Sequence, residues 1–168
     1  MVELVVIGAT LALAAGASGF EGWRRIAGAR ALDRFATWKK CSYAPPNAEA
    51  KSARAFGTRG GLSFAIDFCR VGGKPHTRVV VDSAAARLAR VTVQRRRGAY
   101  IVHGLDPADT EELLSSCSKI ERDVTLTSDG HRISVVWKGL ETDPIAMDSA
   151  LDLAIAACRF ERPDAPYR

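Results

Sequence analysis

The chain has 168 residues, of which 47% are hydrophobic and 26% are charged, values that exclude a disordered tail, a collagen-like repeat and a polytopic membrane protein. The length suits one domain with a short appendage. The net charge of +5 is divided unevenly, with −2 over residues 1–23, +13 over residues 24–105 and −6 over residues 106–168. Charge blocks of this kind inform on partners rather than on the fold.

An uncharged run of 17 residues, 4–20, lies between Glu3 and Glu21. As a helix it would be about 25 Å long, at the short end of what spans a bilayer. Trp23 and the Arg24-Arg25 pair follow, as is typical of a membrane interface. The sequence therefore predicts a single-pass transmembrane anchor over residues 1–23. Its main spanning residues are Leu4, Val5, Val6, Ile7, Leu11, Leu13 and Phe20.

Two alternatives to an anchor stay open for this run. One is a cleaved signal peptide, with small residues at Ala15-Gly16-Ala17, although the preceding Met-Val-Glu lacks the positive charge that a signal peptide needs. The other is a buried Ala/Gly-rich helix. Gly8, Ala12 and Gly16 share one helix face, and this small-xxx-small pattern would support a homodimer.

Basic residues follow the run and are absent before it, so the positive-inside rule predicts that the C-terminal domain is cytoplasmic and the N-terminus outside. Contact with anionic lipid is predicted for Trp23, Arg24, Arg25, Arg30, Arg34, Lys39 and Lys40. The bias of 18 Arg to 6 Lys is typical of a GC-rich bacterial genome. We therefore predict that the membrane is a bacterial inner membrane. The layout resembles that of small single-pass bacterial proteins with an α+β domain.

Residues 24–46 are predicted to be a juxtamembrane stem. Residues 24–41 can continue as helix, with an irregular apolar side formed by Ile26, Ala27, Leu32, Phe35 and Trp38, and Pro45-Pro46 then makes a hinge. The head domain is predicted over residues 47–162, followed by a tail over 163–168.

Strand patterns open the head domain. Apolar residues alternate over 62–69, and Gly60-Gly61 turns the chain back onto a strand at 54–58. Gly72-Gly73 turns it again into a strand over 77–82. These segments predict an antiparallel meander.

The second half contains two similar blocks, each a hairpin followed by a helix. Strands at 91–93 and 99–103 precede Asp106-Pro107, and strands at 124–126 and 132–137 precede Asp143-Pro144. Asp before Pro is a helix start, because the carboxylate caps backbone amides and Pro suits the first turn. We therefore predict an α+β fold with six or seven strands, mainly antiparallel, a ββα-ββα-like second half and two amphipathic helices on one face.

No catalytic, metal or cofactor motif is found in the sequence. Cys41, Cys69, Cys117 and Cys158 show no CxxC spacing, and the three histidines are scattered. His103 precedes Asp106 at a strand-to-helix junction, where a strand-end histidine and a helix cap explain both residues. We predict no catalytic residue, no metal site and no cofactor.

A basic cluster lies in the middle of the chain. Its residues are Arg87, Arg90, Arg95, Arg96 and Arg97. Only Tyr100 is near for base stacking, so the cluster favours contact with lipid or a protein partner over nucleic acid.

The leading hypothesis is a single-pass membrane protein whose cytoplasmic head is a non-catalytic binding or scaffolding module. A second is an exported binding domain with disulfides, produced by cleavage near Ala17. A third is an enzyme with a site near His103 and Asp106.

Overall fold

The computed structural model describes residues 22–47, 52–82, 91–96, 99–105, 107–117, 123–128 and 131–159. Helix α1 spans residues 22–39. The strands of the first half are β1 (Ser42–Ala44), β2 (Arg54–Arg59), β3 (Leu62–Val71) and β4 (Lys74–Asp82). The second half contains β5 (Thr92–Arg96), β6 (Ala99–His103), α2 (Pro107–Cys117), β7 (Val124–Ser128), β8 (Arg132–Lys138) and α3 (Pro144–Ala157).

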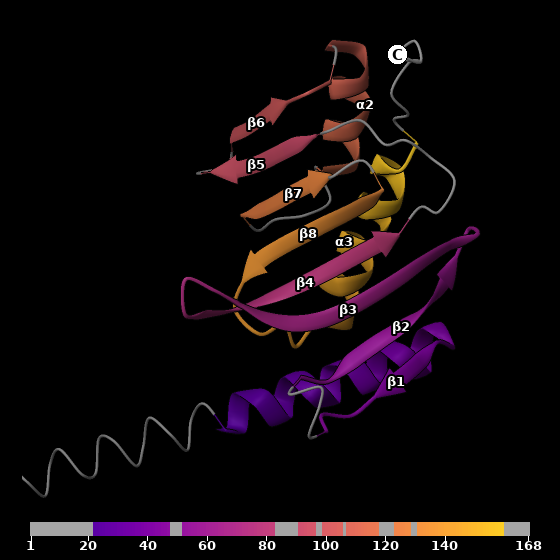
Figure 1. Cartoon of the computed structure of the whole chain (residues 1–168), viewed down its shortest axis with the longest axis vertical. Helices are drawn as coiled ribbons and strands as arrows, with labels where there is room; N and C mark the ends of the chain where they lie inside the picture. The colour runs from indigo at the N-terminus through magenta and orange to yellow at the C-terminus, as the bar shows by residue number, and fades with distance from the viewer. Residues whose placement is uncertain are drawn as a thin grey trace, which may run out of the picture.

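The eight strands of the described residues form a single antiparallel sheet in the order β1-β2-β3-β4-β8-β7-β5-β6. The helices lie behind this sheet in Figure 1, with α1 next to β1 and β2 at one end. The α+β fold, the antiparallel sheet and the two hairpin-helix blocks are thus confirmed. The sheet has eight strands rather than the six or seven expected, because the short β1 also pairs, with Tyr43 opposite Ala55.

Local sequence explains the two tightest turns. Gly60-Gly61 connects β2 to β3 and Gly72-Gly73 connects β3 to β4, and all four glycines have positive φ. Two consecutive positive φ values define the type I′ turn, whose twist matches that of the adjacent strands. These turns fix the register in which Arg59 faces Leu62 and Val71 faces Lys74.

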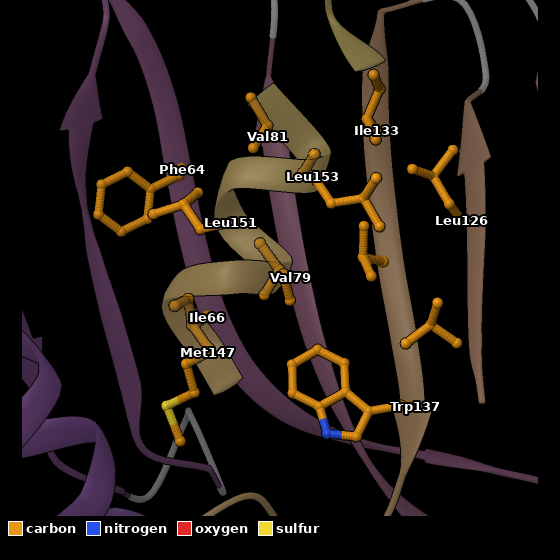
Figure 2. Packing of buried hydrophobic residues seen from close by; sticks show 14 of the residues in the cluster. Phe64, Ile66, Val79, Val81, Leu126, Ile133, Trp137, Met147, Leu151 and Leu153 are labelled. Carbon is orange, nitrogen blue, oxygen red and sulfur yellow. The ribbon is translucent and has the colours of Figure 1, made fainter. Parts of the chain in front are cut away.

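The core lies between the sheet and the helices. Alternate residues of the central strands point toward α3, among them Ile66 of β3, Val79 of β4 and Val135 of β8, which are opposite one another in the register. Figure 2 shows Met147, Leu151 and Leu153 of α3 over these strands. The sheet therefore has one face covered by helices and one face without them among the described residues.

Helix α1 belongs to this same core. Leu32 and Phe35 are fully buried, and Ala31 and Ala36 are buried beside them. At Gly28 an added Cβ would lie 2.9 Å from the Phe68 ring of β3, so the absent side chain allows the helix to approach the sheet closely. The segment expected to be a separate stem is therefore packed against the head, while the boundaries after residues 23, 46 and 162 stay predictions.

Helix α3 starts as the Asp-Pro pair predicts. The Asp143 side chain accepts a hydrogen bond of 2.9 Å from the Ile145 amide, and Pro144 occupies the first turn. Helix α2 starts at Pro107, and the capping role of Asp106 lies outside the described residues.

Replacing Asp143 by Ala is expected to lower the free energy of unfolding by about 1 kcal/mol, because an N-terminal amide of α3 loses its acceptor. Urea unfolding of the full chain in mild detergent measures the loss. Asp143→Asn is the matched control, since it keeps a capping oxygen, and equal losses in the two variants would contradict a capping role.

Candidate functional site

The first candidate site is the N-terminal end of α1, which is exposed and follows the predicted anchor directly. The run at 4–20, with the dimer pattern of Gly8, Ala12 and Gly16, lies outside the described residues. Among the described residues, no helix has the length and apolar character needed to cross a membrane. Residues 22–26 at the start of α1 are all exposed, and Trp23 retains 64% of its accessible surface.

Helix α1 has two different sides, although its apolar residues were predicted to share a single one. Leu32 and Phe35 face the core, whereas Ile26 and Trp38 point away from it and are 55% and 52% exposed. Treating these residues as a single apolar side was wrong. Their helical positions carry the signal, since Ile26 lies on the opposite side of a 3.6-residue helix from Phe35, and Ile26 and Trp38 are each six residues from Leu32, about 120° away from it around the helix.

The basic residues of α1 differ in their surroundings. Arg24, Arg25, Arg30 and Lys40 are exposed, and Arg34 is exposed while donating a 3.3 Å hydrogen bond to the Thr142 carbonyl. Lys39 is half-buried and forms a 2.6 Å ion pair with Asp148 of α3. Its predicted contact with lipid thus competes with a contact inside the domain.

Asp148 connects three elements of the fold. Its second oxygen accepts a 2.7 Å hydrogen bond from Arg59 of β2, which also pairs with Asp152. Because Asp148 is largely shielded from water, its two ion pairs join α1, β2 and α3 more firmly than exposed pairs would.

Glu141 is the buried carboxylate of the described residues, and sequence reasoning missed it. It lies between β8 and α3 and is 2% exposed. One oxygen accepts hydrogen bonds from the amides of Thr142 and Asp143, at 2.9 and 3.0 Å, and the other accepts one of 3.1 Å from the Trp137 indole. These donors identify a carboxylate that organises the loop. The sequence feature that could have indicated this residue is its position four residues after Trp137, within reach of the indole N–H.

Thr77 extends this network onto β4. It is fully buried, and its hydroxyl donates to the Gly139 carbonyl and accepts from the Glu141 amide, both at 2.8 Å. The loop of Gly139 and Glu141 is thereby tied to the centre of the sheet. The buried polar groups of this region therefore stabilise the fold.

The sheet face without helices carries charged pairs between neighbouring strands. Arg78 donates two hydrogen bonds, of 2.9 and 2.7 Å, to Asp67 on the adjacent strand. The bond to Asp67 raises the pKa of Arg78, although burial opposes this shift. Arg132 and Asp82 form a similar pair at 2.6 Å. Such cross-strand pairs are typical of a solvated antiparallel face.

Three cysteines whose side chains the structure describes, Cys41, Cys69 and Cys158, are free thiols. Burial raises the pKa of Cys158 to about 11. Burial also raises the pKa of Cys41, with a backbone hydrogen bond opposing, and that of Cys69, with Arg78 opposing and Asp67 adding to the shift. A nucleophilic cysteine needs a lowered pKa, whereas burial shifts the pKa of each of these three thiols in the opposite direction.

Other predicted residues are placed as follows. His103 is exposed at the end of β6, and its proposed neighbour Asp106 lies outside the described residues. The basic cluster also lies outside what the structure describes. This applies to Arg87, Arg90 and Arg97 as whole residues, and to the side chains of Arg95 and Arg96 in β5. Within the described ranges, no group of three His, Cys, Asp or Glu side chains is arranged to hold a metal ion.

Comparison of the chain with family models, with curated proteins and with solved structures finds no match.

Proposed function

We propose that this protein is a single-pass membrane protein whose cytoplasmic α+β domain is a non-catalytic binding or scaffolding module at the inner surface of the membrane. The proposal starts from the uncharged run at 4–20 and the basic residues that follow it. Helix α1 is the observation that supports it best. Gly22, its first described residue, comes two positions after the run, and Phe35 lies in the core of the domain.

This arrangement has a mechanical consequence. An anchor that ends at Phe20 would be separated by one residue, Glu21, from a helix that is held by the core and by the Lys39–Asp148 ion pair. The domain would then have a fixed position at the membrane rather than hang on a flexible linker, as suits a scaffold that presents one surface to a protein partner.

The described polar groups support a binding role over a catalytic one. The buried carboxylate of Glu141 has three donors, and Asp148 is paired through both oxygens. The carboxylates that the fold shields most are thus committed to its structure.

Membrane topology tests the proposal. One reporter active only in the cytoplasm and one active only after export are fused in turn behind Arg168, and the membrane fraction is assayed. We expect cytoplasmic activity in the membrane fraction. Leu11→Lys should reduce that fraction, because a charge near the middle of the span costs about 3 kcal/mol, whereas the matched Leu11→Ala should retain it.

Two outcomes would overturn the proposal. Activity of the export reporter would favour the exported domain with disulfides. A membrane fraction unaffected by Leu11→Lys would show that residues 4–20 are not the anchor.

A further inference from the structure

The outer face of α1 is the side opposite its contact with the core. We define it by Trp23, Ile26, Arg30, Arg34 and Trp38. These residues are spaced by three or four positions, so they follow one side of the helix over about 22 Å. All five are exposed, and Gly28, Leu32 and Phe35 on the other side are buried.

The composition of this face is that of an interfacial helix. Three large apolar side chains remain more than half exposed, with a Trp near each end and two Arg between them. Trp prefers the headgroup level of a bilayer, and Arg binds anionic headgroups. Residues 22–40 contain six basic residues and one acidic residue, Asp33, so the helix is complementary to a negatively charged surface.

Asp33 does not interrupt the face at its centre. Asp33 follows Ile26 by seven positions, so it lies in line with Ile26 at one edge of the face, about 60° from Arg30. The basic residues at the centre of the face, Arg30 and Arg34, therefore outnumber this one acidic residue at its edge.

Trp38 is held in place at the far end from the anchor. Its ring meets Phe35 edge-on at 6.4 Å, and the Lys39 ammonium lies 3.7 Å from the ring centroid. Lys39 is in turn fixed by Asp148 of α3. An aromatic side chain that is both exposed and positioned loses little entropy when it enters an interface.

We propose that the outer face of α1 lies flat on the anionic cytoplasmic surface of the membrane, with Trp23 and Trp38 both at headgroup level. The inference rests on the proposed function and adds the orientation of the domain. An anchored domain that stood upright on α1 would bring Trp23 to the membrane and leave Trp38 in water.

Tryptophan quenching separates these two arrangements. The full chain is reconstituted in vesicles of phosphatidylcholine and phosphatidylglycerol with brominated acyl chains, which quench indole fluorescence on contact. The chain has three Trp, and Trp137 is buried in the core, so Trp23→Phe reports Trp38, Trp38→Phe reports Trp23, and the double variant gives the background of Trp137.

We expect the brominated lipid to quench the fluorescence of each single variant by more than it quenches that of the double variant. In vesicles of phosphatidylcholine alone, the Trp38 signal should lose its quenching while that of Trp23 stays quenched. Within the Trp23→Phe protein, Arg30→Glu should abolish the quenching of Trp38. Lys138→Glu, which makes the same charge change at an exposed residue of β8, should leave it intact.

The contrary results are distinct. Quenching of Trp23 without Trp38 would overturn the flat orientation and keep the anchor. Quenching of neither would remove the anchor and the orientation together. Quenching of Trp38 that is equal in neutral vesicles, or equal in the Arg30→Glu and Lys138→Glu proteins, would overturn the role of anionic lipid.

Discussion

Replacing Glu141 by Ala is expected to lower the free energy of unfolding by about 3 kcal/mol. The substitution removes the acceptor of the Trp137 indole and of the Thr142 and Asp143 amides. A buried donor without a partner costs about 1–3 kcal/mol, and part of this cost is relieved where water can enter. Urea unfolding of the full chain in mild detergent, followed by fluorescence, gives the value.

Glu141→Gln should have an intermediate effect. The amide oxygen can still accept from the two backbone amides, but the amide nitrogen then faces the Trp137 N–H, and one hydrogen bond is lost. Glu111→Ala, at an exposed position of α2, is the control and should change the stability by less than about 0.5 kcal/mol. Equal losses for Gln and Ala would show that the backbone amides do not depend on this carboxylate.

Replacing Phe35 by Ala should destabilise the whole domain by about 3–5 kcal/mol. Phe35 is fully buried on α1, and truncation leaves a cavity between this helix and the rest of the core. The same unfolding experiment measures the loss, with the exposed Thr37 on the same helix as the control through Thr37→Ala.

This variant also tests the domain limits. A stem that is independent of the head would tolerate Phe35→Ala with no change in the unfolding midpoint of the sheet. A large loss shared by the helix and the sheet would show that α1 and the strands unfold as one cooperative unit.

Much of the local structure was predictable because it depends on short-range rules. The alternation in β3, the glycine pairs of the two turns and the Asp143-Pro144 helix start each occur within a few residues. Their conformations follow from backbone sterics and capping, and no distant contact is needed to recognise them.

The remaining features depend on contacts between distant segments. The pairing of β4 with β8, which joins the two halves of the sheet, connects residues such as Val79 and Val135. The packing of Phe35 and the three donors of Glu141 likewise require the assembled fold. Local periodicity predicts where helices and strands occur, but it does not predict which of them pack together. For this reason α1 was expected to be a separate stem.

The position of α3 has a consequence for the order of events during synthesis. This helix is the last element described, yet its residues Met147 and Leu151 cover strands β3 and β4, which are translated about 70 residues earlier. The apolar faces of those strands therefore cannot be buried until α3 has left the ribosome. Until α3 has been synthesised, the nascent sheet keeps this apolar face open, and an open face of this kind is exposed to chaperone capture.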